Sequence, residues 1–210
     1  MAKKSIGAYI TLDGEKEFRT ATSACNKSVA ALKSEMKLAE AQTVGNANTL
    51  DTLKKKHDIL SRTLDEHVKK EETVKKGLKN SEEQYEKVGN KLAEYKSKLQ
   101  QTKSALEELE NSSETTEEAL QEQRELVEGL EKIVSKGEET YRRAGNRVSD
   151  WKKQLNNAEA QTIRATKALN ENDTYLKEAE KSWKGCAKSI DEFGNETDDT
   201  VNQITKLGTI

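Results

Sequence analysis

Two histidines and two cysteines are the residues in this chain best suited to bind a metal or to act as nucleophiles: His57, His67, Cys25 and Cys186. A structural zinc site takes about four Cys, His or carboxylate ligands, usually as close pairs. His57 and His67 are ten residues apart, and neither has a cysteine or aspartate at metal-ligand spacing. We therefore expect no metal site.

The cysteines are expected to pack rather than to react. A free cysteine is a small hydrophobe that is often buried, and disulfides are rare in proteins kept in the cytoplasm. The sequence also shows no activated nucleophile, no paired catalytic carboxylates and no glycine-rich phosphate loop. We predict that the chain is not an enzyme, has no cofactor and has no catalytic residues.

The strongest pattern in the sequence is structural: apolar residues recur every three or four positions, in one register from Phe18 to Phe193. Apolar residues spaced about every 3.5 positions form a seam along one helix face, and that seam requires a partner helix. With Leu78 at heptad position a, His57 and His67 fall at a and d, where polar residues are tolerated interruptions. The a positions after Leu78 are Tyr85, Leu92, Leu99, Leu106, Ser113, Leu120, Val127, Val134, Tyr141, Val148, Leu155, Thr162, Leu169, Leu176, Trp183 and Ile190, and the d positions include Val74, Val88, Tyr95, Leu109, Leu130, Ala144, Trp151, Ala158, Ala165, Ala179, Cys186 and Phe193.

Composition supports long helices. The chain is 35% charged, 32% hydrophobic and 4% aromatic and has no proline, whereas a compact globular protein is roughly 45–50% apolar. A net charge of −2 argues against a dedicated nucleic-acid binder. No window approaches about 18 consecutive apolar residues, and the start of the chain lacks the apolar run of a signal peptide. We expect a cytoplasmic protein that neither binds specific nucleic acid nor spans a membrane.

The expected fold is all-α, with long helices in coiled-coil or elongated bundle packing and a short amino-terminal strand. Residues 6–12 read as that strand, closed by a turn within residues 1–14. Breaks at 45–48 and 111–116 contain Gly, Asn, Ser and Thr, which favour helix ends and caps, and Thr115 with Glu118 has the form of a capping box. The expected helices are 15–44, 49–110 and 116–193, followed by a polar tail at 194–210.

The break at 111–116 leaves two conformations open, a kinked continuous helix and an antiparallel return. Residues 51–103 hold 14 basic and 10 acidic side chains, a net charge of +4, whereas residues 104–140 hold 3 and 12, a net charge of −9. Folding back would place a basic helix beside an acidic one, although ordinary variation in charge along solvated faces explains the difference equally well.

An internal repeat supports duplication of a helical unit. The segment Glu82–Asn90 is echoed by Glu138–Asn146, and Tyr95-Lys96 by Trp151-Lys152. The offset is 56 residues, or eight heptads, so the seam register is preserved.

Two segments carry a resemblance to a known family. They are Ala39–Leu60, with Ala-Glu-Ala-Gln-Thr followed by Gly-Asn-Ala-Asn-Thr-Leu, and Tyr141–Glu159, with a Tyr, a Gly-Asn, a Trp and a Leu-Asn-x-Ala-Glu at fixed spacing. Over about residues 10–190 the chain resembles the amino-terminal helical region of bacteriophage tail tape measure proteins. The resemblance implies a helical ruler and scaffold inside the tail tube, with tail tube subunits and tail assembly chaperones as partners. It also implies location in the host cytoplasm during assembly and in the tail lumen of the virion.

The chain is short for that family, whose members often carry apolar segments or a muralytic domain, so we expect an amino-terminal portion or a prophage remnant. Between Ala119 and Val134 the apolar stripe widens to include Leu126 and Ile133, which predicts that three or more helices meet there. A homotrimer or another homo-oligomer would supply them, as would hairpins paired in a dimer. The alternative function is a generic cytoplasmic coiled-coil scaffold or tether.

Overall fold

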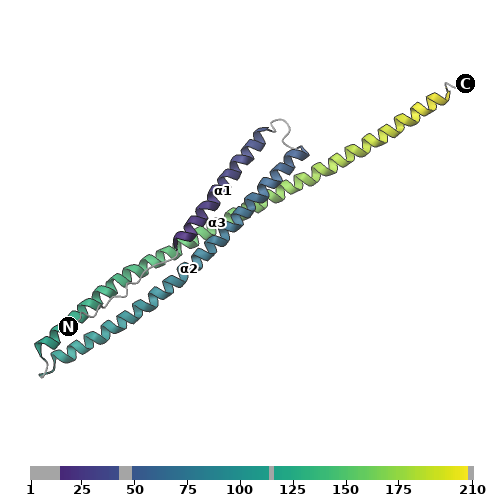
Figure 1. Cartoon of the computed structure of the whole chain (residues 1–210). Helices are drawn as coiled ribbons and strands as arrows, with labels where there is room; N and C mark the ends of the chain where they lie inside the picture. The colour runs from purple at the N-terminus through teal and green to yellow at the C-terminus, as the bar shows by residue number, and fades with distance from the viewer. Residues whose placement is uncertain (1–14, 43–48, 114–115, 208–210) are drawn as a thin grey trace. The chain divides into compact units, whose positions relative to one another are not determined.

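The computed structural model describes residues 15–42, 49–113 and 116–207, with side-chain surroundings as far as Phe193. It contains three helices, α1 (Glu15–Gln42), α2 (Leu50–Glu110) and α3 (Glu117–Leu207) (Figure 1). The prediction of an all-helical chain is therefore confirmed for the described residues. The expected strand at residues 6–12 lies outside them.

Local side-chain chemistry explains where α2 and α3 begin and end. Thr49 Oγ1 accepts a hydrogen bond from the Thr52 amide at 3.4 Å, and Thr116 Oγ1 accepts one from the Ala119 amide at 3.3 Å. These are N-cap bonds, which satisfy amides that have no partner in the first helical turn. At the end of α2, the Asn111 side chain donates to the Glu107 carbonyl oxygen at 2.9 Å. The capping residue of α3 is thus Thr116, one position after the expected Thr115, which lies outside the described residues.

Helix α3 continues to Leu207, whereas the sequence pattern predicted an end at Phe193 and a polar tail. The predicted end depended on Gly194 and the polar residues after it. A single glycine costs only about 1 kcal/mol in a helix interior, so it does not end a helix without a following proline or a capping arrangement.

The chain divides into two compact units, and every helix contributes to both. Unit 1 comprises Met1–Ala24 and Lys70–Glu159, and unit 2 comprises Cys25–Lys69 and Ala160–Ile210.

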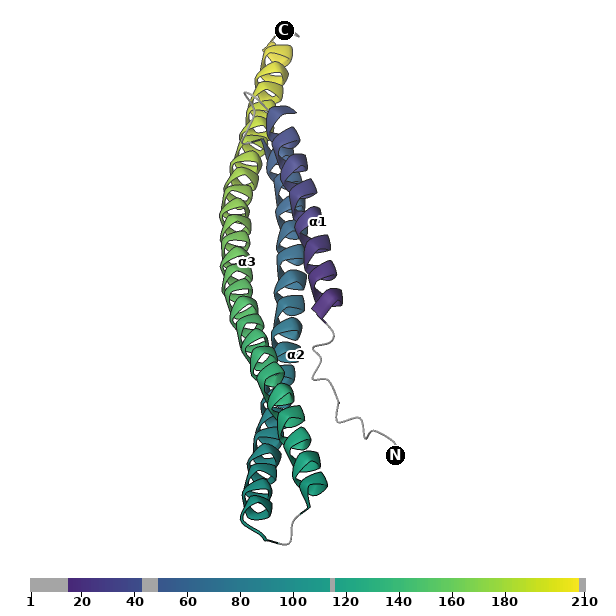
Figure 2. The same cartoon turned by 90° about the vertical axis from the view of Figure 1, so that its left-hand side faces the viewer.

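In unit 1, α2 and α3 run antiparallel (Figures 1 and 2). Near the connection, Gln123 Nε2 donates to the Thr102 carbonyl oxygen at 3.0 Å. Farther away, Lys152 Nζ lies 3.5 Å from Glu82 Oε1. The chain therefore folds back between Glu110 and Glu117. The core follows the predicted seam and comprises Val74, Val88, Leu92, Leu130, Val134, Ala144, Trp151 and Ala158.

The first turns of α1 also belong to unit 1, where they lie along α3. The rings of Phe18 and Trp151 meet edge to face with centroids 6.4 Å apart, and Arg147 pairs with Glu15 at 3.2 Å. Glu15 contacts Arg147 and Phe18 contacts Trp151, so the residue numbers of the contacting pairs rise together in the two helices. This part of α1 is therefore parallel to α3.

Unit 2 places α2 between α1 and α3. Arg62 binds both carboxylate oxygens of Glu35 at 2.6 and 3.1 Å, and Asn172 Nδ2 donates to the Leu53 carbonyl oxygen at 3.0 Å. Its buried apolar residues are Val29, Leu32, Leu53, Ile59 and Ala165. Thr52 and Ile59 are buried although both lie at heptad position c, because a helix with two neighbours buries a wider stripe than a two-position seam.

The widened stripe of α3 in unit 1 contacts one helix, α2, among the described residues, and the further helices expected from a homo-oligomer stay a prediction. Leu126 is 39% exposed, and Ala119 and Ile133 are half-buried. The described contacts of this stretch are with α2, so the described residues show no third helix there.

None of the described helices has an apolar stretch of the length that crossing a membrane requires.

Candidate interaction site

The residues with the most reactive side chains are dispersed. In unit 2, His57 Nδ1 lies 2.7 Å from Asp173 Oδ1, and His67 is buried. Among the described residues no three His, Cys, Asp or Glu side chains converge as a metal site would require. Cys25 is half-buried, whereas Cys186 is exposed and does not pack between helices as expected.

The aromatic residues of the seam are the most organised feature of unit 1. Tyr85 of α2 stacks on Tyr141 of α3, with ring centroids 4.4 Å apart and ring planes 18° apart. Each ring also lies over the glycine of the opposite helix. A Cβ atom at Gly145 would be 3.3 Å from Cε2 of Tyr85, and a Cβ atom at Gly89 would be 3.1 Å from Cε2 of Tyr141.

We call these four residues, Tyr85, Gly89, Tyr141 and Gly145, the tyrosine layer. Glycine allows this close approach, because a methyl group at either position would require the facing ring to move by a few tenths of an ångström. Hydrogen bonding to the Tyr141 hydroxyl, together with burial, raises the pKa of Tyr85 above its ordinary value. In the tyrosine layer the two helices are thus joined both by stacked rings and by a hydrogen bond between the tyrosine side chains.

The tyrosine layer is symmetric because its halves are the two copies of the 56-residue repeat. Tyr85 and Gly89 correspond to Tyr141 and Gly145. The flanking ion pairs are related in the same way, because exchanging the two repeats converts one pair into the other. Lys96 pairs with Glu138 at 2.6 Å, and Lys152 pairs with Glu82 at 3.5 Å. The repeats therefore face each other across a local two-fold axis, as two identical subunits do in an isologous dimer.

Trp151 has a related but unpaired arrangement in unit 1. It is 2% exposed, and a Cβ atom at Gly77 of α2 would be 2.9 Å from Cη2 of its indole. The corresponding residue of the first repeat is the smaller Tyr95, which is half-buried. Sequence reasoning found the apolar seam and the repeat but not the role of Gly77, Gly89 and Gly145. The recurrence of Gly four residues after Tyr85 and Tyr141 is the signal that could have revealed the roles of Gly89 and Gly145. No such recurrence marks Gly77.

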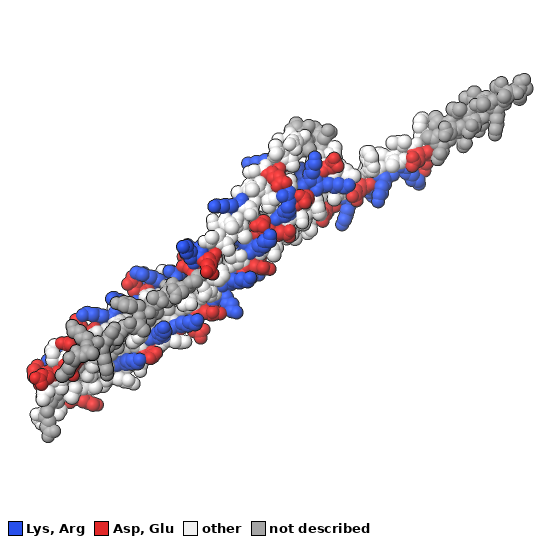
Figure 3. Space-filling view, viewed as in Figure 1, with Lys and Arg blue, Asp and Glu red and all other residues white. Residues whose placement is uncertain are grey.

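Surface charge adds many weak contacts. Figure 3 shows Lys and Arg mixed with Asp and Glu over the described face in view. In unit 1, Lys103 and Lys96 of α2 pair with Glu131 and Glu138 of α3, each at 2.6 Å. These groups are about half exposed, so each pair stabilises the fold by roughly 0.2–1 kcal/mol. The basic and acidic blocks noted in the sequence do meet here, but they add little stability.

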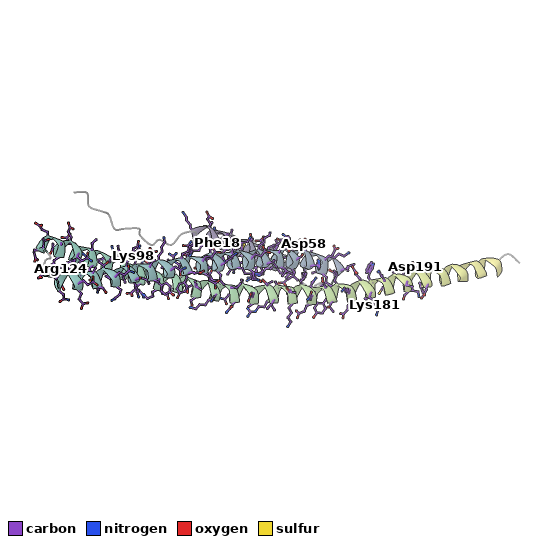
Figure 4. All side chains as sticks on the ribbon, turned by 90° about the horizontal axis from the view of Figure 1, so that it is seen from below. Phe18, Asp58, Lys98, Arg124, Lys181 and Asp191 are labelled. Carbon is purple, nitrogen blue, oxygen red and sulfur yellow. The ribbon has the colours of Figure 1, made fainter. Side chains whose placement is uncertain are left out.

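In unit 2 the seam of α3 extends beyond its neighbours. In Figure 4 no other helix lies beside the segment between the labelled Lys181 and Asp191. Every residue from Lys181 to Phe193 is exposed, and Trp183 and Ile190 are each 69% exposed. The expectation that the seam packs against a partner helix is confirmed at Trp151 and is not met by the described residues at Trp183. We call Ala179, Trp183, Cys186 and Ile190 the distal seam.

No protein-family profile, curated protein or solved structure matches the chain. The two candidate sites are helix surfaces: the tyrosine layer, which is paired within the chain, and the distal seam, most of which is exposed.

Proposed function

We propose that the chain is a structural protein of phage tail assembly, a tape measure segment that serves as length ruler and scaffold inside the tail tube. One observation carries the proposal. Helices of 61 and 91 residues hold a single heptad register, so residue number converts to length along the helix. The resemblance of residues 39–60 and 141–159 to the tape measure family supports the specific role.

The conversion depends on whether the α2–α3 hairpin is open. At about 1.5 Å per residue, α3 has a contour length of roughly 140 Å and α2 one of roughly 90 Å. In the hairpin α2 lies beside α3 and adds almost nothing to the span. The proposal therefore assigns the hairpin to the protein before assembly and the extended helix to the tube.

The hairpin interface is suited to opening. Its seam includes Ser81, Gln123 and Asn172, of which Gln123 and Asn172 donate to backbone carbonyl oxygens of α2. Polar seam residues fix the register of paired helices and lower their stability. A hairpin with such a seam keeps one arrangement yet opens at a lower cost than an entirely apolar one.

The proposed partners are the tail tube subunits and the tail assembly chaperones, together with further copies of this chain. The proposed locations are the host cytoplasm during assembly and the tail lumen afterwards.

Deletion in the phage or prophage that encodes the chain tests the ruler. Removing Glu82–Gly137 deletes 56 residues, keeps the heptad register and should shorten the tail by about 84 Å. Removing Glu110–Gly137, which is four heptads, should shorten it by about half as much. Electron micrographs give the tail lengths, and unaltered or longer tails would overturn the ruler role.

The second candidate is a cytoplasmic coiled-coil scaffold or tether. It is favoured by the three-helix packing of unit 2, which forms without any tube. The neighbouring genes separate the two: major tail and distal tail genes support the ruler, and their absence supports the tether.

A further inference from the structure

The distal seam repeats the sequence pattern of the tyrosine layer. Tyr85 and Tyr141 lie at position a and are followed four residues later by Gly89 and Gly145. Trp183 also lies at position a, 42 residues or six heptads after Tyr141, and the small Ala187 follows it by four residues. At position a the chain thus carries three pairs of an aromatic and a small residue, of which two face each other in unit 1.

The third pair has no facing helix among the described residues of unit 2. Trp183 and Ile190 are 69% exposed, whereas Ala165, earlier in the same seam, is buried. Toward the carboxyl end of α3, Asn172 and Asp173 are the last residues with a described hydrogen bond to α2. The distal seam continues that interface, in the same register, past the end of its partner.

The side chains beside the distal seam allow two identical helices to meet. Positions e and g flank a helix seam and hold Glu180, Ser182, Ala187 and Ser189 around Trp183. Only Glu180 is charged, and in antiparallel pairing its position e faces position e of the second copy, which holds Ala187 and Gly194, so two copies would bring no like charges together there. This differs from the flanks of the tyrosine layer, where Lys96 and Lys152 pair with Glu138 and Glu82.

We propose that the distal seam is a self-association site, at which it crosses the distal seam of a second copy of this chain in the antiparallel sense. The two α3 helices diverge beyond Ile190, because in one continuous register residues 191–207 of the second copy would lie where α2 begins at Leu50. In the arrangement of the tyrosine layer, Trp183 lies over Ala187 of the second copy and the reciprocal contact forms at the same time. The antiparallel heptad layers then pair Trp183 with Cys186 of the second copy and Ala179 with Ile190 of the second copy. The inference does not depend on the proposed function, because a ruler and a tether could both use it.

Alanine in place of glycine changes the spacing only slightly. The glycines of the tyrosine layer have rings at 3.1 and 3.3 Å from a notional Cβ, which is closer than ordinary van der Waals contact. An alanine methyl needs a few tenths of an ångström more, so the two copies would lie slightly farther apart than α2 and α3. The short interface predicts a dimer that dissociates on dilution.

Mass measurement over a concentration series tests the site. The 210-residue chain of 23.5 kDa should approach twice that mass at high concentration in light scattering after gel filtration, and Trp183→Lys should keep the monomer mass throughout. Ile163→Lys is the matched control, because Ile163 is also 69% exposed but lies outside the seam. It should dimerise like the unaltered chain.

A monomer at every concentration, a dimer that survives Trp183→Lys, or a dimer lost equally in Ile163→Lys would each overturn the proposal. Circular dichroism should show equal helicity in the three proteins.

Spin labels test the orientation. Single spin-labelled non-natural amino acids replace Lys181 and Lys167, both on exposed positions of α3, so that Cys186 of the distal seam is kept. Antiparallel pairing about the distal seam gives an axial offset between copies of about 10 Å at position 181 and about 50 Å at position 167. Short, nearly equal distances at the two positions would show parallel pairing and overturn the proposed geometry.

Discussion

Trp151 and Trp183 belong to the same helix and the same apolar seam, yet the first is 2% exposed and the second is 69% exposed. In unit 1 the indole of Trp151 meets Gly77 of α2 and Phe18 of α1. In unit 2 the indole of Trp183 has no such partner among the described residues. The comparison shows that a heptad pattern specifies the ability to pair, whereas the length of the neighbouring helices decides which part is paired within the chain.

The largest expected effect comes from truncating Trp151, and truncation of Trp183 is the comparison. Trp151→Ala removes a fully buried side chain and should lower the free energy of unfolding by about 3–5 kcal/mol. Trp183→Ala removes an exposed one and should change it by less than about 0.5 kcal/mol at concentrations where the chain is a monomer. Urea denaturation followed by circular dichroism measures both, and equal effects would contradict the assigned burial.

A smaller effect is expected where the tryptophan meets glycine. Gly77→Ala places a methyl group 2.9 Å from the Trp151 ring and should destabilise the protein by about 1–3 kcal/mol, because the packed ring must move.

Gly129→Ala is its control, since no atom lies within 4 Å of the added methyl group. It should stabilise α3 by about 0.5–1 kcal/mol through helix propensity. Thermal melting compares the two variants, and a stabilising Gly77→Ala would rule out the close packing described for unit 1.

The smallest effect tests the symmetry of the repeat. Double-mutant cycles on Lys96 with Glu138 and on Lys152 with Glu82 should give similar coupling energies of about 0.2–1 kcal/mol that decline as salt is added. The pair Lys98 with Glu94 lies within one helix and should keep its coupling when the hairpin opens. Coupling at only one of the two symmetric pairs would show that the repeats do not share one geometry in solution.

Much of the helical architecture follows from local properties of the sequence. The absence of proline, the abundance of Lys, Glu, Gln and Ala, and the hydroxyl residues at the breaks predict long helices with ends near those observed. The prediction was weakest after Phe193, where one glycine and a polar run suggested a helix end that α3 does not have. Glycine lowers the stability of a helix interior by about 1 kcal/mol, and this is too small to end a long helix.

Contacts between distant residues could not be predicted in the same way. The repeat is visible in the sequence, but a 56-residue offset is compatible with an extended helix as well as with a hairpin. The burial of Thr52 and Ile59 outside the seam also required knowledge that α2 has two neighbours in unit 2.

The sequence by itself determined that this protein is helical, that one seam runs along its helices and that its repeats preserve the register, because helix propensity and heptad spacing act over a few residues. Only the tertiary structure decided that the repeats face each other through the tyrosine layer and that Trp183, Cys186 and Ile190 of the distal seam are exposed. The direction in which a chain returns, and where its partner helix ends, depend on which surfaces meet in space, and a periodic pattern is the same whichever partner it has.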